Sequence, residues 1–309
     1  MKRSGLLAAL ASLALIASSC GSDDDSSTAD TSAPDTAPVT EPAATEPPVT
    51  EPETTERAPT DVPTTDAPVD GVPERVVSLS PTHTEIMFAV GAGDLLVAVD
   101  EFSDFPAEAL ELPNELSGFE PNVEAIASYD PDLVLIGGDF TGLGAQLDEL
   151  GIAYFDGPAA QTFDDTYSQI AEIGTLTGQE DEAAEVVSSM QTRIDELVAA
   201  APALDEPLSV YHEVDDTYFS ADSTSFIGAT YTLFGLENIA DQAEGDNFGF
   251  PQLNTESIIS ADPDLIFLPC GTFCFTTPDD VASRPGWDAI AAVQNGNVIE
   301  VDEDTASRW

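Results

Sequence analysis

The two histidines of this chain have the side chains that most directly suggest chemistry. His83 follows an apolar run at residues 75–79, and His212 follows another at residues 208–211, with Glu213 beside it. Imidazole and carboxylate groups bind transition metals and haem iron, so these side chains would form a metal or haem site if they converged. The alternative is structural: His83 lies in a helix-capping region, and His212 is hydrogen-bonded at the end of a strand. We favour the structural interpretation.

The three cysteines are Cys20, Cys270 and Cys274. The last two stand in C-G-T-F-C, a spacing that suits a small-loop disulfide in an oxidising compartment. A metal site is the other interpretation of such a pair, but further ligands are missing from the neighbouring sequence. We therefore expect a Cys270–Cys274 disulfide.

Signatures of an enzyme are missing from the sequence. It contains no G-x-S-x-G nucleophile elbow, no phosphate-binding loop and no Cys–His nucleophile spacing. Aspartate and glutamate, 59 in all, are too abundant for any carboxylate pair to be diagnostic. We expect a protein without catalytic activity, resident metal or cofactor.

A repeat indicates the elements that position these residues. Residues 122–136 read N-V-E-A-I-A-S-Y-D-P-D-L-V-L-I, residues 254–268 read N-T-E-S-I-I-S-A-D-P-D-L-I-F-L, and eight of the fifteen positions are identical. Each copy predicts a short helix, a stop at Asp-Pro-Asp, and an apolar strand buried on both faces as in a parallel sheet. The repeat therefore predicts two similar lobes.

Further apolar runs predict strands near residues 75–79, 95–99 and 152–155, and near residues 208–211 and 298–301. Pro81, with Thr82 and Glu85 as a capping box, predicts a helix after the first strand. Residues 166–201 are amphipathic and favour a helix, which Gly178 is able to divide. We predict an α/β fold, with two lobes of mainly parallel sheet at residues 73–165 and 205–309, joined by one long helical connector at residues 166–204.

The N-terminus has the features of a targeting signal. Lys2 and Arg3 precede an apolar stretch that is too short to span a bilayer. The stretch ends in A-S-S-C-G, which resembles a bacterial lipobox with alanine in place of the usual aliphatic residue; an ordinary secretory signal is the alternative. We expect a signal peptide at residues 1–20, lipidation of Cys20, and an extracytoplasmic protein held at the cell membrane by lipid alone.

Residues 21–72 are rich in Thr, Pro and acidic residues, which predicts a disordered tether whose composition also permits O-glycosylation. The whole chain has 7 basic and 59 acidic residues and a formal net charge of −52. Because the phosphates of nucleic acid would be repelled, nucleic acid is a poor partner. Adaptation to salty surroundings is one interpretation of the acidity, and compositional bias of the source is the alternative.

Several motifs together resemble a known family. They are R-V-V-S-L-S-P-T-H-T-E at residues 75–85, S-D-F-P at 103–106, G-F-E-P-N-V-E at 118–124, and both D-P-D-L units. They are similar to those of the Fe-siderophore and vitamin B12 (cobalamin) class of ABC-importer substrate-binding proteins, over about residues 73–309. The resemblance implies the class III periplasmic-binding-protein architecture, with the ligand between two α/β lobes. It also implies a helix after the last strand, whereas this sequence ends at Trp309.

Open α/β sheets bind ligands at the carboxyl ends of their strands. We expect ligand contacts from the residues at those ends, which are Ser80, Thr82, His83, Phe102, Phe119, Gly138, Phe140, His212, Glu213, Tyr218, Phe250 and Phe273. In the vitamin B12 members aromatic residues match Phe102, Phe119 and Phe250, and flat aromatic walls suit a macrocycle. The alternative is that each aromatic side chain packs in the hydrophobic core and does not contact a ligand. The scarcity of lysine and arginine argues against strongly anionic ferric catecholates.

The resemblance also assigns a role to the repeat. In the vitamin B12 members one glutamate on each lobe docks on arginines of the permease, and the matching residues here are Glu124 and Glu256. The alternative is that the helix dipole alone favours each glutamate. The expected function is that of a lipid-anchored, monomeric protein that captures a ferric siderophore or a corrinoid and delivers it to an ABC permease.

Two other functions compete with this expectation. A free-metal or haem carrier would use His83 and His212. A surface adhesion module has only the tether in its favour.

Overall fold

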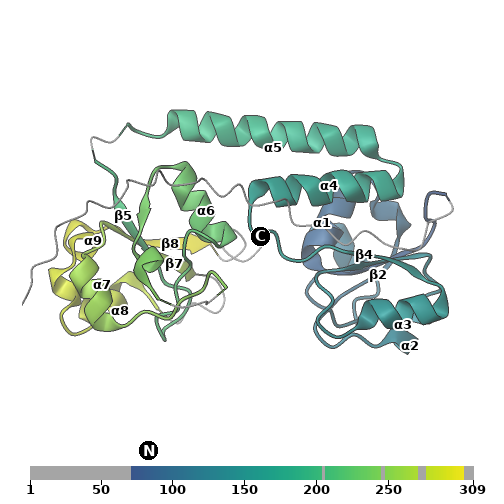
Figure 1. Ribbon diagram of the computed structural model, residues 1–309, viewed down its shortest axis with the longest axis horizontal. Helices are drawn as coiled ribbons and strands as arrows, with labels where there is room; N and C mark the ends of the chain where they lie inside the picture. Colours follow the sequence, from purple (N-terminus) through teal and green to yellow (C-terminus); the bar gives the residue numbers. More distant parts are fainter. Residues whose placement is uncertain (1–70, 204–205, 245–247, 271–275, 303–309) are drawn as a thin grey trace, which may run out of the picture. The chain divides into compact units, whose positions relative to one another are not determined.

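The computed structural model describes residues 71–203, 206–244, 248–270 and 276–302. These residues form two α/β lobes, with two helices between them along the chain (Figure 1). Lobe 1 comprises β1 (Val76–Leu79), α1 (Pro81–Ala89), η1 (Gly93–Leu95), β2 (Leu96–Val99), η2 (Ala107–Glu111), α2 (Val123–Ala127), β3 (Leu133–Ile136), α3 (Leu143–Leu150) and β4 (Ala153–Asp156).

The connecting helices are α4 (Phe163–Thr177) and α5 (Glu180–Ala200). Lobe 2 comprises β5 (Ser209–His212), α6 (Phe226–Leu233), β6 (Glu237–Asn238), η3 (Ile239–Gln242), α7 (Thr255–Ala261), β7 (Leu265–Cys270), α8 (Pro278–Ser283), η4 (Trp287–Ala289), α9 (Ala291–Asn295) and β8 (Val298–Asp302).

Each lobe has its own four-stranded sheet, and the strand order repeats. The order is β2-β1-β3-β4 in lobe 1 and β6-β5-β7-β8 in lobe 2, with every pairing parallel. The two copies of the sequence repeat supply β3 and β7, which occupy the same place in separate sheets. The two parallel α/β lobes expected from the repeat are therefore confirmed.

Alternation along the strands of lobe 1 fills two cores, one on each face of the sheet. Leu133 and Leu135 of β3 join a core with α1, α4 and α5, and Val134 and Ile136 of the same strand join a core with α2 and α3. All four side chains are buried. Because helices cover both faces, the strand reads as an unbroken apolar run, as in other parallel sheets.

Lobe 2 is also covered on both faces. Tyr211, Ile266 and Trp287 belong to a core formed with α7, α8 and α9. On the other face α6 contributes Tyr231, whose ring stacks on Phe267 of β7 with centroids 5.1 Å apart. The helices of Figure 1 therefore enclose this sheet as they do the first.

The identical residues of the repeat have identical structural roles. Asn122 begins α2 by accepting the N–H of the third helical residue at 3.0 Å, and Asn254 begins α7 in the same way at 2.9 Å. After each helix an aspartate takes a left-handed backbone, with φ of 51° at Asp130 and 49° at Asp262. The following proline cannot continue the helix, so the chain turns into the strand.

The second aspartate of each Asp-Pro-Asp fastens the first strand of its lobe. Asp132 accepts the backbone N–H of Arg75 at 3.0 Å just before β1, and Asp264 accepts the N–H of Ser209 at 2.9 Å at the start of β5. These bonds satisfy N–H groups at the amino ends of the central strands. The repeat therefore also ties each of its strands to the first strand of the same lobe.

The start of α1 differs from the expected capping box. Ser80, and not Thr82, is the N-cap, and its side chain accepts the N–H of His83 at 3.4 Å. Pro81 is the first helical residue, as expected, because its missing N–H needs no partner there. The helix therefore begins earlier than a Thr82 cap would place it.

The connector is a pair of helices and not one continuous helix. Gly178 has φ of 69° and ends α4, so the division considered for this residue is the one observed. α4 begins at Phe163, three residues before the expected start, because Thr162 and Asp165 form a capping box. Ile170 and Ile173 of α4 lie in the core of lobe 1, and Val186, Val187 and Met190 of α5 pack against that core. Among the described residues, no helix is long and apolar enough to cross a bilayer.

Candidate ligand-binding edges

Phe102 and Phe119 are exposed together at the strand-end edge of lobe 1. Phe102 lies in the loop after β2, and Phe119 precedes α2. Their exposed fractions are 54% and 76%, and the rings meet edge to face with centroids 5.7 Å apart. Exposed aromatic groups of this kind offer apolar area and ring faces to a flat ligand. The structure thus brings together two of the predicted ligand-binding residues and leaves both outside the core.

A buried chain of hydroxyl groups holds the loop that carries Phe102. Ser78 donates to the carbonyl of Ser80 at 3.1 Å, and Thr84 donates to the hydroxyl of Ser78 at 2.9 Å. The hydroxyl oxygens of Thr84 and Ser103 are 2.9 Å apart, and the hydroxyl of Ser103 donates to the carboxyl of Asp100. Burial raises the pKa of Asp100, and the hydrogen bond from Ser103 opposes that shift. The hydroxyl chain thus ties the loop after β2 to β1 and α1.

The end of β3 supplies a second exposed aromatic group. Phe140 is 90% exposed and follows Gly138, whose φ is 113°. A side chain at Gly138 would collide with the ring of Phe140, and the positive φ also favours glycine there. Asp139 caps α3 by accepting the N–H groups of Leu143 and Gly144 at 2.7 and 3.0 Å. Phe140 is therefore presented on a short turn anchored to α3.

His83 points into the core of lobe 1. It is 1% exposed, its Nε2 lies 3.1 Å from Oε1 of Gln169 in α4, and its ring contacts Phe155 with centroids 5.3 Å apart. Burial lowers the pKa of His83 to about 4, and the hydrogen bond to Gln169 opposes that shift only in part. Ser80 beside it is buried as the cap of α1, whereas Thr82 is exposed. Of these three predicted residues, only Thr82 is available to a ligand.

His212 is likewise held inside its own lobe. Its Nδ1 lies 2.7 Å from the hydroxyl oxygen of Tyr231 on α6, and the side chain is buried. Burial lowers the pKa of His212 to about 4, so the ring is neutral at physiological pH. Within the described residues, no three His, Cys, Asp or Glu side chains form a cluster suited to a metal ion. This placement favours the structural interpretation of both histidines.

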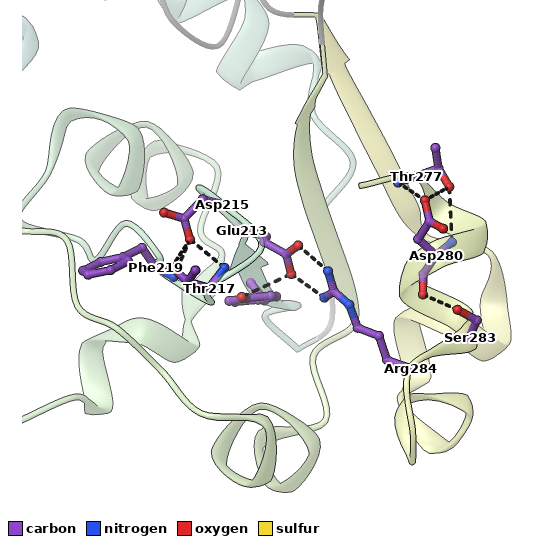
Figure 2. Close-up of polar contacts among 9 residues, drawn as sticks. Glu213, Asp215, Thr217, Phe219, Thr277, Asp280, Ser283 and Arg284 are labelled. Atoms are coloured by element: carbon purple, nitrogen blue, oxygen red, sulfur yellow. Dashed lines mark hydrogen bonds and ion pairs between the residues drawn. The ribbon is translucent and has the colours of Figure 1, made fainter. Parts of the chain in front are cut away.

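Glu213 forms an ion pair and does not present a free carboxylate. Its Oε2 and Oε1 accept from the two terminal nitrogens of Arg284 at 2.6 and 2.7 Å, and the Tyr211 hydroxyl donates to Oε2 at 3.4 Å. Figure 2 shows the two planar groups facing one another at the end of β5. The Arg284 guanidinium also lies over Trp287 and Tyr218, 4.5 and 5.3 Å from the ring centroids.

Tyr218 is fixed by this group and by the loop that precedes it. Its ring stacks on Trp287 with centroids 5.9 Å apart, and its own φ is 69°. Asp215 closes the turn by accepting the N–H and the hydroxyl of Thr217 at 2.9 and 2.6 Å (Figure 2). Sequence reasoning missed Arg284 and Trp287; Arg284 is the single arginine between residues 206 and 302, a signal that was available.

Of the remaining predicted residues, the structure describes Phe250 but not Phe273 or the side chains of the three cysteines. Phe250 is half-buried, and its neighbour Phe248 is 85% exposed. Phe273, Cys274 and Cys20 lie outside the described residues, as does the side chain of Cys270, so the expected disulfide and lipidation remain predictions. Two surface hollows lie elsewhere, one along α5 and one between η3 and α7, and neither is lined by the predicted ligand-binding residues.

Glu124 and Glu256 occupy the same position in the two copies of the repeat. Both lie in the first turn of their helices, α2 and α7, and both are exposed. In the described part of the chain, neither carboxylate has a hydrogen bond or ion pair. Each is therefore available to a partner, and each also benefits from the helix dipole.

Two parallel-sheet lobes joined by helices, with exposed aromatic groups at the strand ends of lobe 1, are the arrangement of a solute-binding protein. The chain belongs to the periplasmic binding protein family, whose profile matches residues 76–305. An uncharacterized ABC transporter substrate-binding lipoprotein of Bacillus subtilis is 31% identical over 244 residues, which is 76% of this chain and 75% of the relative.

Two further proteins extend the comparison. A cobalamin-binding protein of Halobacterium salinarum is 34% identical over 245 residues, or 75% of this chain and 64% of that relative. A solved periplasmic heme-binding protein of Vibrio cholerae superimposes with a TM-score of 0.65 at 26% identity, covering 76% of this chain and 91% of the other. The protein is accordingly a non-enzymatic, extracytoplasmic substrate-binding component that works with an ABC permease.

Proposed function

We propose that this protein is the lipid-anchored substrate-binding component of an ABC importer and captures a large metal chelate, a corrinoid or an iron chelate, between its two lobes. The observation that carries this proposal is the exposed pair Phe102 and Phe119, with ring centroids 5.7 Å apart at a strand-end edge. Exposed ring faces of this kind suit a flat, largely apolar ligand. The 34% identity with a cobalamin-binding protein supports a corrinoid in particular.

Anchoring would keep the protein near its permease. Cys20 carries the lipid in this proposal, and residues 21–72 form a tether that extends roughly 40 Å by random-coil scaling. The similarity to a relative named as a lipoprotein supports this arrangement. The tethered protein would act as a monomer.

Docking on the permease would use Glu124 and Glu256. Both carboxylates are exposed and stand at matching positions of two similar lobes. Two separated negative charges fix the orientation of a rigid body on a partner that carries arginines at two related positions. The protein would therefore present the same face to the permease in every transport cycle.

A haem carrier is the second candidate, because a solved heme-binding protein has the same fold at 26% identity. His83 and His212 are buried and hydrogen-bonded, so this candidate would need another iron ligand. The absorbance spectrum of the protein mixed with haem tests it directly. Haem ligated by another side chain would produce a Soret shift that persists when both histidines are replaced, and the absence of any Soret shift would exclude this candidate.

The proposed function is tested by calorimetric titration of the full chain with cyanocobalamin and, separately, with ferric siderophores. We expect saturable binding of one of these chelates with one molecule bound per chain. Absence of binding to every corrinoid and iron chelate would refute the proposal.

A further inference from the structure

Among the described residues, the strand-end edge of lobe 2 has a single positive charge, and that charge is compensated. Arg284 is the only lysine or arginine between residues 206 and 302. Its guanidinium forms two hydrogen bonds, of 2.6 and 2.7 Å, with Glu213, the residue that directly follows β5. The Glu213 side chain is 2% exposed and that of Arg284 is 15% exposed.

The pair is built into the lobe on every side. Trp287 and Tyr218 cover the guanidinium, and the Tyr211 hydroxyl donates to Glu213. Both carboxylate oxygens and both terminal nitrogens of the arginine are therefore committed to one another (Figure 2). A carboxylate or catecholate ligand at this edge would meet a group of zero net charge.

The other arginines of the described residues lie away from the strand-end edges. Arg75 precedes β1, at the amino end of the sheet, and its guanidinium donates to the carbonyls of Tyr129 and Asp130. Arg193 is on α5, where it pairs with Glu196 at 3.6 Å. Neither residue offers a cation to a ligand at the carboxyl ends of the strands.

Acidic side chains, in contrast, are frequent beside the same edges. Glu101 is next to Phe102, Glu120 is next to Phe119, and Asp215 and Asp216 follow Glu213 in the chain; all four are exposed. An anionic ligand would be repelled by these carboxylates, and no arginine that the structure describes would compensate for the repulsion. A neutral or cationic ligand would not be repelled.

We propose that Glu213 is a specificity-determining residue that, by neutralising Arg284, restricts the ligand to neutral or cationic chelates. This inference rests on the proposed function and deepens it. It assigns to Glu213 a role different from the direct ligand contact expected from the sequence. Glu213 acts by removing a positive charge that would otherwise attract anionic chelates.

The test compares the dissociation constants of three probes, measured by tryptophan fluorescence and calorimetry on the full chain. Cyanocobalamin is electroneutral, haem carries anionic propionates, and a ferric tris-catecholate is an anion. We expect the wild-type protein to bind cyanocobalamin at least about ten-fold more tightly than either anion. Glu213→Gln keeps the size and shape of the side chain but removes its negative charge. In this variant the affinity for each anion should rise about five-fold, which is the effect of one solvent-screened charge. The affinity for cyanocobalamin should stay unchanged.

Two further variants control for a purely structural role. Glu237→Gln removes one charge from the same lobe, at the amino end of β5. It should leave the ratio of the cyanocobalamin affinity to the anion affinities unchanged. The double variant Glu213→Gln/Arg284→Gln removes both charges and should return the ratio to the wild-type value. Equal loss of affinity for all probes in Glu213→Gln would show a structural role and overturn the inference.

The wild-type protein provides a test that does not depend on the variants folding. If the wild-type protein binds either anion as tightly as it binds cyanocobalamin, the inference is overturned and the proposed function is left intact. Binding of no probe and no other metal chelate would refute the proposed function itself.

Discussion

Phe102 and Phe119, which are 17 positions apart in the sequence, meet edge to face although both rings are mostly exposed. An aromatic pair that leaves so much apolar area in solvent has a clear use if a ligand covers it. The pair also depends on the buried hydroxyl chain that ends at Asp100, because that chain holds the loop of Phe102 in place.

Replacing either aromatic residue should weaken ligand binding without unfolding the protein. We expect Phe102→Ala and Phe119→Ala each to raise the dissociation constant for cyanocobalamin about ten-fold, since each removes a stacking ring worth about 1 kcal/mol beyond its area. Calorimetric titration gives the constants. Phe234→Ala, a partly exposed phenylalanine at the end of α6, is the matched control and should bind as the wild type does. An unchanged affinity in both edge variants would remove these rings from the site.

Asparagine should replace Asp100 well, whereas alanine should not. The carboxyl of Asp100 accepts from Ser103, and in Asp100→Asn the side-chain amide oxygen would accept in its place. Asp100→Ala leaves the buried hydroxyl chain without this acceptor and should cost about 1–3 kcal/mol of unfolding free energy. Burial raises the folded-state pKa of Asp100, so its contribution to stability falls as the pH rises through that pKa. Asp100→Asn should lose this pH dependence. Urea unfolding at several pH values measures both effects, and a loss of unfolding free energy in Asp100→Asn as large as that in Asp100→Ala would contradict this account.

Acid should destabilise the protein through its two histidines. Burial lowers the folded pKa of each to about 4, below the ordinary value of 6.5. Between pH 6.5 and pH 4 the unfolded chain therefore binds more protons than the folded chain. The contribution of each neutral histidine to the free energy of unfolding is fully present above pH 6.5 and is lost as the pH falls to 4. Moving from pH 7 to pH 5 should cost about 2 kcal/mol for each histidine. In His83→Gln/His212→Gln this part of the loss should disappear; an identical pH dependence in the variant and the wild type would contradict the burial of the rings.

Charge reversal at the two repeat glutamates should separate capture from delivery. In Glu124→Arg/Glu256→Arg we expect unchanged affinity for the chelate, because both residues lie on α2 and α7 and not among the edge aromatics. Uptake of labelled ligand by cells or by permease-containing vesicles should fall at least about ten-fold. Glu149→Arg, an exposed glutamate on α3, is the control. Normal uptake in the double variant would exclude these residues from docking.

The fold was largely predictable because its signals are local. The helix cap at Asn122, the turn at Asp130 and the apolar strand that follows lie within fifteen contiguous residues, and the same order recurs at Asn254. A cap, a proline turn and a buried strand each depend on neighbours in the sequence. Spacing alone therefore predicted two lobes and most strands of both sheets.

The site was less predictable because its decisive contacts are distant in the sequence. The partner of His83 is Gln169, 86 residues away, and the partner of Glu213 is Arg284, 71 residues away. A histidine or glutamate at a strand end has the same local sequence whether it faces a ligand or a buried partner. Exposure at a strand end needs no particular partner, so the exposure of Phe102 and Phe119 is compatible with the expected ligand contact, which stays a prediction.

The central claim, that this protein carries a neutral or cationic metal chelate, is tested most directly by mass spectrometry of the small molecule that co-purifies with the full chain from its native cells. We expect a corrinoid or another chelate without net negative charge, released on denaturation at one molecule per chain. Release of haem, an anionic ferric chelate or a metal-free solute would contradict the claim.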